Sequence, residues 1–279
     1  MAEPTQPGPS RGRTAEILGL VVLIGGLAFV LYKFAVRGDA GRKAESAEDR
    51  GHVLKVLFIG NSYTYVNDLP GTLEALAKAA GEDPYIQVQG FTAVGANLKV
   101  HWDSGAATAI RDTDWNFVVL QERSLIPLES VDRDTLFFPY ARKFHEVIKA
   151  RRATALFYMT WTRPDSRAPQ ENVTRPYLDI TRELGARVAP AGMALELVLK
   201  RNPNFKFYAD QIGQPTPAGT YLVACTFFAA IYEKTPVGLP ATVTTAARQA
   251  IGVSRDEAPV VQSAAWEAFL SSKARLNEK

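Results

Sequence analysis

From Val53 onward, short apolar segments alternate with longer segments of helical periodicity, and this alternation limits the possible folds more than any other feature. Strands are expected at 53–59, 85–88, 116–120, 153–159, 187–189 and 205–208, and helices at about 68–80, 135–151, 172–184, 192–200 and 216–232. Strands that alternate with helices in this way form a parallel sheet with helices on both faces. The sequence therefore predicts an α/β protein.

Three segments precede this region. Residues 1–14 are rich in Pro and Gly and are expected to be disordered. Residues 15–36 are almost uncharged, and a run of roughly 20 apolar residues matches one bilayer thickness, so they predict a transmembrane anchor. Residues 37–52 are small and charged and are typical of a linker.

A cleaved signal peptide is the alternative for residues 15–36, with Arg11 and Arg13 as its positive end. Lys33 and Arg37 interrupt the apolar region, however, and no clean small-x-small cleavage site follows it. These features favour an anchor that stays uncleaved.

The composition excludes some classes of site. The net charge of +3 gives no independent reason to expect a nucleic-acid partner, and we expect none. We interpret the basic cluster of Arg142, Lys143, Lys149, Arg151 and Arg152 as a solvated helix face. The single Cys225 excludes an internal disulfide and a thiolate metal cage, and its apolar neighbours predict a buried thiol. His101 and Asp103 alone do not define a metal site, so no metal or other cofactor is expected.

The segment Lys55–Thr64 carries the chemistry. An apolar strand ends abruptly in Gly60-Asn61-Ser62, at the carboxyl edge where open α/β sheets bind ligands. A serine nucleophile needs a base, an orienting carboxylate and oxyanion donors. Asp210, after the last expected strand, is a candidate for the carboxylate. Candidate oxyanion donors are the backbone N–H groups of Ser62 and Gly95 and the side chains of Asn97 and Gln121.

From about residue 55 to 240, the chain resembles the SGNH (GDSL-type) hydrolases, in particular a bacterial subgroup with Gly-Asn-Ser in the nucleophile block. The resemblance rests on five elements in this order: Phe58-Ile-Gly-Asn-Ser-Tyr-Thr64, Gly95 with His101-Trp102, Val118-Val-Leu-Gln-Glu122, Tyr158-Met-Thr-Trp161 and Pro215-Thr-Pro-Ala-Gly-Thr-Tyr-Leu222. It implies a flavodoxin-like three-layer α/β/α fold and hydrolysis of acyl esters of carbohydrates or lipids. It also implies Ser62 as the nucleophile, with the Ser62 and Gly95 N–H groups in the oxyanion hole.

The hydrolase domain is thus expected at 53–240. Residues 241–279 add a helical extension, because Ser254 and Glu257 have the spacing of a capping box before a helix to about Leu270.

The chain departs from the family pattern at two places. In place of the family's asparagine oxyanion donor stands Gln121 or Arg123. The family's catalytic histidine is missing after Asp210, and its position holds Gln214, or Gly213 under the shorter spacing. Glutamine hydrogen-bonds a serine but does not accept its proton at neutral pH. Loss of a triad base costs about 10⁴-fold in rate or more.

The three histidines of the chain offer a poor replacement. His52 lies in the linker and His145 within a helix, whereas His101 lies in the loop region after Gly95 and is the one candidate for an alternative base. The His101-Trp102 pair is otherwise expected to be structural or to line the substrate site. Trp102 and Trp161 suit either substrate lining or core packing.

Two hypotheses follow. The first is a single-pass, membrane-anchored esterase with activity reduced or redirected by the missing histidine. The second is a non-catalytic relative that binds an acylated glycan or another envelope ligand. The expected location is the bacterial inner membrane. Exported family members favour a domain outside the cytoplasm, whereas Lys33, Arg37, Arg42 and Lys43 after the span favour the inside.

Overall fold

The structure is a computed structural model that describes residues 53–278. The predicted disordered segment 1–14, the anchor 15–36 and the linker 37–52 lie outside the described residues. Within residues 53–278, no helix combines the length and the apolar character needed to cross a bilayer.

Five parallel strands form the central sheet in the order β2-β1-β3-β4-β5. The strands are β1 (Val53–Gly60), β2 (Tyr85–Thr92), β3 (Phe117–Leu120), β4 (Thr154–Tyr158) and β5 (Arg187–Ala189). This is the flavodoxin-like order, in which the chain leaves β1 toward one side of the sheet and later continues on the other. The carboxyl ends of β1 and β3 flank that switch point, where such sheets bind ligands. The predicted α/β fold is confirmed.

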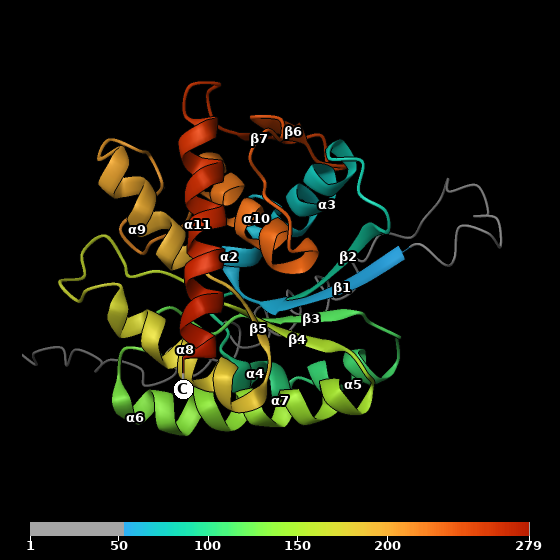
Figure 1. The fold of residues 1–279 in the computed structure, drawn as a ribbon. Helices are drawn as coiled ribbons and strands as arrows, with labels where there is room; N and C mark the ends of the chain where they lie inside the picture. Colours follow the sequence, from blue (N-terminus) through green and yellow to red (C-terminus); the bar gives the residue numbers. More distant parts are fainter. Residues whose placement is uncertain (1–52, 279) are drawn as a thin grey trace, which may run out of the picture. The chain divides into compact units, whose positions relative to one another are not determined.

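Helices cover both faces of the sheet (Figure 1). One face carries α3 (Leu69–Ala79), α9 (Ala191–Arg201), α10 (Pro217–Tyr232) and α11 (Ala258–Asn277). The other carries α4 (Leu98–Asp103), α5 (Ala106–Arg111), α7 (Phe138–Ala150) and α8 (Glu171–Leu184). The short α2 (Ser62–Tyr65) follows β1, and α6 (Ser130–Asp132) and a π-helical turn (Arg133–Phe137) precede α7.

The core consists of two apolar clusters separated by the sheet. Side chains of β1 alternate between them: Val56 and Phe58 face one cluster, and Leu57 and Ile59 face the other. Because both faces of β1 are buried, the strand is apolar throughout its second half, and this pattern made it recognisable in the sequence.

Helix α10 lies deep in one of these clusters and begins shortly after Gln214 in the sequence. Thr216 caps the helix by accepting a hydrogen bond from the Gly219 N–H at 3.1 Å, and Pro217 occupies the first turn, as predicted. Cys225 is fully buried within this helix, and burial raises the pKa of its thiol to about 12. The prediction of a buried thiol is confirmed.

Several predicted boundaries were wrong. The segment 205–208 is not a strand: only a single bridge joins Tyr208 to Pro215. Helices α4 and α5 were not predicted, nor was the hairpin of β6 (Thr242–Thr244) and β7 (Ala250–Gly252). The predicted capping box is present, with Ser254 N–H donating to Glu257 and Glu257 N–H donating to Ser254, but α11 extends beyond Leu270 to Asn277.

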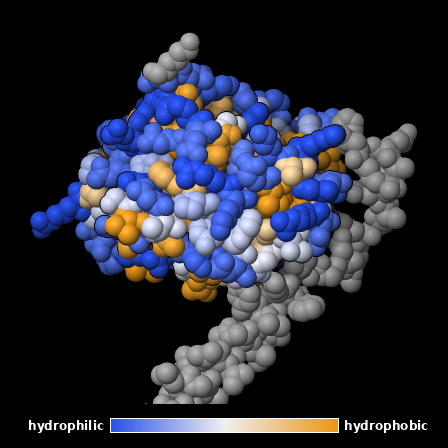
Figure 2. Space-filling model, turned by 90° about the horizontal axis from the view of Figure 1, so that it is seen from below, coloured by the Kyte–Doolittle hydropathy of each residue, from blue (hydrophilic) through white to orange (hydrophobic). Residues whose placement is uncertain are grey.

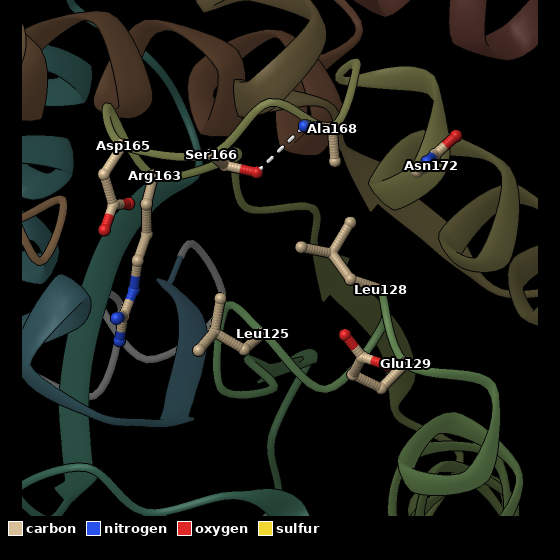
Figure 3. Close-up of a pocket in the computed structure, with 8 residues that line it drawn as sticks. All are labelled: Leu125, Leu128, Glu129, Arg163, Asp165, Ser166, Ala168 and Asn172. Atoms are coloured by element: carbon tan, nitrogen blue, oxygen red, sulfur yellow. Dashed lines mark hydrogen bonds between the residues drawn. The ribbon is translucent and has the colours of Figure 1, made fainter.

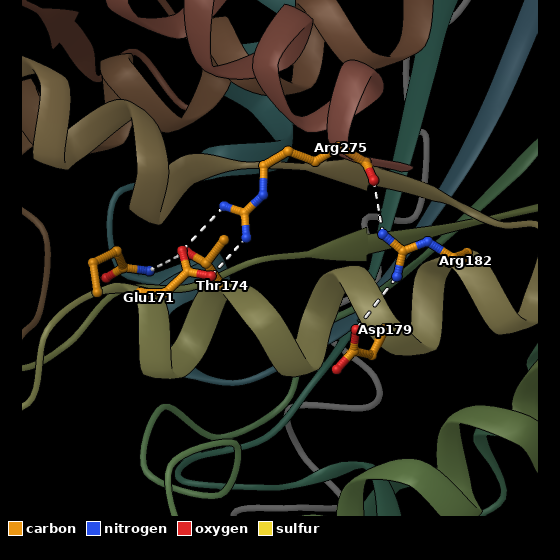
Figure 4. A network of polar contacts seen from close by, with 6 residues as sticks. Glu171, Thr174, Asp179, Arg182 and Arg275 are labelled. Atoms are coloured by element: carbon orange, nitrogen blue, oxygen red, sulfur yellow. Dashed lines mark hydrogen bonds and ion pairs between the residues drawn. The ribbon is translucent and has the colours of Figure 1, made fainter. Parts of the chain in front are cut away.

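The C-terminal helix is tied to the opposite face of the sheet. Arg275 of α11 donates to both carboxylate oxygens of Glu171 on α8, at 2.6 and 3.0 Å, and Arg182 donates to the Arg275 carbonyl at 2.7 Å (Figure 4). Residues 241–278 of the extension therefore pack against the sheet domain.

The basic cluster around α7 is exposed, as predicted. Arg142 pairs with Glu183 and Arg151 pairs with Asp114, both at the surface. The molecular face seen from below α7 is largely hydrophilic, with scattered apolar side chains (Figure 2).

Candidate active site

Ser62 lies at the first turn of α2, immediately after β1. The side chain of Asn61 caps this short helix by accepting a hydrogen bond from the Tyr63 N–H at 3.2 Å. Gly60 is needed at the end of the strand because a Cβ there would lie 2.5 Å from Oε1 of Gln121. The turn therefore presents a half-buried serine at the carboxyl edge of the sheet.

Gln214 faces Ser62. Its Nε2 donates to Ser62 Oγ at 2.7 Å, across 152 positions of sequence. The backbone N–H of Gln214 donates to Oδ1 of Asp210 at 2.9 Å, so the carboxylate holds the main chain at Gln214 and does not contact its side-chain amide. Ser62 and Asp210 are thus both hydrogen-bonded to Gln214, the residue at the expected histidine position, one through its side chain and the other through its backbone N–H.

The structure distinguishes the two alignments of that position. Gly213 is buried with a φ of +87°, and a Cβ there would lie 2.6 Å from the Tyr63 hydroxyl oxygen. Gly213 also accepts a hydrogen bond from Trp161 Nε1 at 3.0 Å through its carbonyl. A histidine at 213 would not fit, so Gln214 is the structural counterpart of the missing base.

Two backbone N–H groups are candidates for the oxyanion hole. The N–H groups of Ser62 and Gly95 have no acceptor within residues 53–278. Gly95 is exposed and has a φ of +62°, a conformation that glycine adopts without strain. The carbonyl of Ala96 in the same loop accepts from Asn61 Nδ2 at 3.0 Å, which holds this loop against the Ser62 turn.

The two side-chain oxyanion candidates differ in their contacts. Asn97 caps α4 through its Oδ1, which accepts from the Val100 N–H at 2.9 Å, so its Nδ2 stays a candidate donor. Gln121 is fully buried: its Nε2 donates to Asn61 Oδ1 at 2.7 Å, and its Oε1 accepts from the Asn61 N–H at 2.9 Å. The prediction that Gln121 donates to an oxyanion is wrong, because this reciprocal amide pair uses the donor to position Asn61. Arg123 is exposed in the loop beyond it.

His101 is not a base for Ser62. The ring is fully buried, and Nε2 lies 2.9 Å from the Gly60 carbonyl oxygen, to which it donates. Burial lowers the pKa of His101 to about 4, so the ring is neutral at pH 7. His101 therefore holds the end of β1 from the interior, so the structural alternative is confirmed for it, and the alternatives of a base and of a substrate-lining residue are wrong.

The two tryptophans have packing roles. Trp161 is fully buried and stacks on Tyr63 with ring centroids 4.7 Å apart, so it supports the Ser62 turn without lining the crevice. Trp102 packs edge-on against Phe144 of α7, with ring centroids 5.2 Å apart. Of the two predicted alternatives, core packing therefore holds for Trp161, and Trp102 of α4 packs against α7.

Sequence reasoning missed several residues of the neighbourhood. Glu122 is fully buried and accepts from the N–H groups of Arg123 at 2.6 Å and Leu98 at 3.3 Å, and burial raises its pKa to about 8. Tyr63 donates to the Ile212 carbonyl at 2.8 Å and joins the Ser62 turn to the Gln214 loop. The one visible signal for Glu122 was its position just after the apolar strand that ends at Leu120. Within residues 53–278, no group of side chains has the make-up of a metal site.

The fold matches those of solved proteins, although no family model and no curated relative matches the chain. A DUF4886 family protein from Bacteroides uniformis is 17% identical with a TM-score of 0.61, covering 78% of this chain and 95% of that one. A putative SGNH hydrolase from Slackia heliotrinireducens is 23% identical with a TM-score of 0.54, covering 64% and 99%. A putative GDSL-like lipase from Parabacteroides merdae is 12% identical with a TM-score of 0.53, covering 65% and 96%.

Residues 53–278 therefore have the fold of the SGNH hydrolases and esterases, as the sequence motifs implied. Within this fold, the chain carries a serine just after β1, and Gln214, at the expected histidine position, donates to its hydroxyl.

Proposed function

We propose that this chain is an SGNH-type hydrolase of carboxylic esters with Ser62 as its nucleophile and with a rate limited by Gln214. The observation that supports the proposal most directly is the 2.7 Å contact between Gln214 Nε2 and Ser62 Oγ. In this contact, the side chain at the position that the family resemblance gives to the base reaches the hydroxyl. The candidate substrates are acyl or acetyl esters of carbohydrates or lipids.

Gln214 explains why the activity would be low. An amide nitrogen donates a hydrogen bond and has no basic lone pair, so it cannot take the serine proton. The remaining contributions are substrate binding and the Ser62 and Gly95 N–H groups. In serine hydrolases without a working triad, such groups still give about 10³-fold to 10⁴-fold acceleration over water. We therefore expect slow turnover.

The fit of Gln214 in its site is imperfect. Its Oε1 is buried and has no hydrogen-bond partner within residues 53–278. A buried, unsatisfied polar atom costs about 1–3 kcal/mol. An imidazole would direct an acceptor nitrogen at Ser62 without adding this carbonyl oxygen. The unpartnered Oε1 therefore supports the proposal that Gln214 stands in the place of a histidine.

The test is hydrolysis of a p-nitrophenyl ester by the full-length chain and by Ser62→Ala. The proposal predicts slow turnover that falls at least about tenfold in the variant, since only the wild type forms an acyl-enzyme. Equal rates in the two proteins would contradict it. Thr64→Ser is a matched control for disturbance of the same turn. Thr64 is buried, and its hydroxyl donates to Gln121 Oε1 at 2.7 Å.

The second candidate function is binding without turnover. The observation that favours it is the direction of the Gln214 hydrogen bond, which occupies a lone pair of the Ser62 oxygen. Under this alternative, the ester or glycan ligand binds equally well to the wild type and to Ser62→Ala. Neither protein releases p-nitrophenol above the background rate.

We also propose that residues 15–36 anchor the chain in the inner membrane with the hydrolase domain outside the cytoplasm. The length and apolar character of that segment support the anchor, and an envelope ester substrate suits the outer side. External protease should degrade the domain in spheroplasts and leave it intact in whole cells. Protection in both preparations would place the domain in the cytoplasm.

A further inference from the structure

Glu122 is a buried carboxylic acid to which the proposed reaction gives no role. It lies two residues after the end of β3, and its side chain is fully buried. Its Oε1 accepts from the Arg123 N–H at 2.6 Å, and its Oε2 accepts from the Leu98 N–H at 3.3 Å. Glutamate is rarely buried without partners, because loss of hydration is costly for its charged form. These two contacts therefore indicate what Glu122 does.

The Leu98 contact ties Glu122 to the loop that carries Gly95. Leu98 is the first residue of α4 and is fully buried, so its N–H needs an acceptor from another part of the chain. Glu122 supplies this acceptor, three residues after Gly95. The carboxyl group therefore fixes the end of the loop that leads into α4.

The beginning of the same loop is held at the end of β1. The Ala93 N–H donates to the last carbonyl of β1 at 3.1 Å, and Nδ2 of Asn61 donates to the Ala96 carbonyl at 3.0 Å. Gly95 lies between these two contacts and is exposed. The position of this candidate oxyanion donor thus depends on the bonds on both sides of it, and Glu122 forms the last of them.

The Arg123 contact ties Glu122 to the loop that follows β3. Farther along this loop, Leu125, Leu128 and Glu129 line a cavity of about 420 Å³ that the loop after β4 closes on the other side (Figure 3). Glu122 does not line this cavity. Its carboxyl group holds two backbone N–H groups, so one side chain joins the Gly95 loop to the loop after β3.

The proton of Glu122 decides how strongly it holds them. An ionised carboxylate only accepts, and hydrogen bonds to a charged acceptor are roughly twice as strong as bonds between neutral groups. A protonated carboxyl group makes one of its oxygens a donor. The short bond to Arg123 suits the oxygen that stays a carbonyl, so the longer bond to Leu98 is the one that protonation weakens.

The surroundings of Glu122 place this change near neutral pH. Burial raises the pKa of Glu122 to about 8, although the two N–H groups and the charge of Arg123 lower it; Asp132 of α6 adds to the increase. Tyr177 of α8 is a neutral phenol, since burial and the charge of Glu122 raise the pKa of Tyr177. His101 of α4 is neutral at pH 7. Both forms of Glu122 are therefore populated between about pH 7 and about pH 9.

We propose that Glu122 is a positioning residue for the oxyanion hole, whose carboxylate holds the Leu98 N–H and thereby keeps the Gly95 N–H in place for the ester at Ser62. The ionised form holds the loop, and the neutral form weakens the Leu98 bond. This inference rests on the proposed function for the role of Gly95, and on the contacts of Glu122 for the position of the loop.

The first test follows three ¹³C NMR signals of the full-length chain with pH: Glu122 Cδ, Leu98 Cα and Gly95 Cα. In the wild type, all three should titrate with a common midpoint at about pH 8. In Glu122→Gln, which has a similar shape and does not ionise, the two Cα signals should stay constant. Glu146→Gln removes an exposed carboxylate of α7 and is the matched control, which should titrate like the wild type. Cα signals that do not follow Glu122 in the wild type, or that titrate alike in Glu122→Gln, would overturn the inference.

The second test is the hydrolysis of p-nitrophenyl acetate. The ratio of the wild-type kcat/KM to that of Glu122→Gln should be near 1 at about pH 6, where both side chains are neutral. It should reach about tenfold at about pH 9, mainly through kcat, since a whole oxyanion donor contributes about 10²-fold to 10³-fold and a displaced one loses part of that. Any rise in rate with hydroxide concentration is common to both proteins and cancels in the ratio. Turnover with a ratio that does not change with pH would contradict the positioning role.

Failure of the reaction and failure of the inference give different results. If neither protein exceeds the rate of Ser62→Ala, the proposed function fails, and the ¹³C titration alone decides whether Glu122 positions the loop. If Glu122→Gln does not fold, Asp132→Asn takes its place. Loss of the Asp132 charge should move the midpoint of all three signals to lower pH, because this charge raises the pKa of Glu122. An unchanged midpoint would then contradict the inference.

Discussion

At the scale of single residues, the two positions left open for the missing histidine behave differently. Gln214 directs its amide at Ser62, whereas Gly213 is buried against Tyr63 in a left-handed conformation. The spacing after Asp210 allowed either residue, because sequence spacing does not show which side chain turns toward the crevice. Hydrogen bonds from Tyr63 to the Ile212 carbonyl and from Trp161 to the Gly213 carbonyl fix the direction of the loop.

Gly213→Ala should destabilise the protein by about 1 kcal/mol or more, since alanine is strained at a φ of +87° and its Cβ would meet the Tyr63 hydroxyl. Denaturant unfolding measures the change. Gly95→Ala, also at positive φ but with open space around its Cβ, is the matched control and should cost less. An unchanged midpoint for Gly213→Ala would contradict the packing described for this loop.

His101 should make the fold sensitive to acid. The unfolded chain takes up its proton near pH 6.5, whereas burial holds the pKa of the folded His101 at about 4. Between these values the unfolded state binds more protons, so stability falls as the pH is lowered, by up to about 1.4 kcal/mol per pH unit. The free energy of unfolding of the wild type and of His101→Gln, compared from pH 7 to 4, measures this term. A constant difference between the two proteins would show that His101 does not titrate in this way.

At the scale of elements, the long buried strands and capped helices were predictable, and the short elements were not. β1 and α10 carry strong signals, an apolar run and a Thr-Pro cap. α4 and α5 have six residues each, too few to show helical periodicity, and their form depends on packing against α7. The apolar segment 205–208 packs its Phe207 ring against Trp161 with centroids 4.6 Å apart, so its apolar pattern reflects core packing without strand pairing.

In the candidate site, too, features that depend on tertiary contacts could not be predicted. Ser62 and Asp210 were recognisable from motifs, but the roles of Gln121 and His101 were not. Both side chains pair with groups distant in sequence, Gln121 with Asn61 and His101 with the Gly60 carbonyl. A sequence does not show whether a polar residue near the candidate serine is exposed at the site or is buried and positions the turn from the interior.

Thr216→Ala should destabilise the protein by about 1 kcal/mol, because it removes the cap of α10 and the bond from Thr216 Oγ1 to the Lys206 carbonyl at 2.6 Å. Since Gln214 lies two residues before this cap, we also expect lower residual esterase activity. Thr216→Ser keeps the hydroxyl and should restore both properties. Loss of stability in the serine variant as well would mean that the methyl group, and not the cap, matters.

At the scale of the whole molecule, α11 joins the domain through both apolar and ionic contacts. Phe269 is 8% exposed and belongs to the same cluster as α10, whereas the Arg275–Glu171 pair lies at the surface. Surface ion pairs contribute about 0–1 kcal/mol, and burial of a phenylalanine contributes several times more. The apolar face of α11 is therefore expected to hold the extension in place.

Phe269→Ala should accordingly lower the free energy of unfolding by about 3 kcal/mol, and Arg275→Ala by less than about 1 kcal/mol. Thermal and denaturant unfolding of the two variants measure the difference. The reverse order would mean that the ionic contacts shown in Figure 4 hold the C-terminal helix.

The most direct measurement is the kcat/KM of Gln214→His for p-nitrophenyl acetate, beside the wild type and the double variant Ser62→Ala with Gln214→His. If position 214 is the place of the general base, the histidine should raise the rate at least tens-fold, and the double variant should lose the gain. A histidine that gives no increase, or an increase that survives without the Ser62 hydroxyl, would contradict the account.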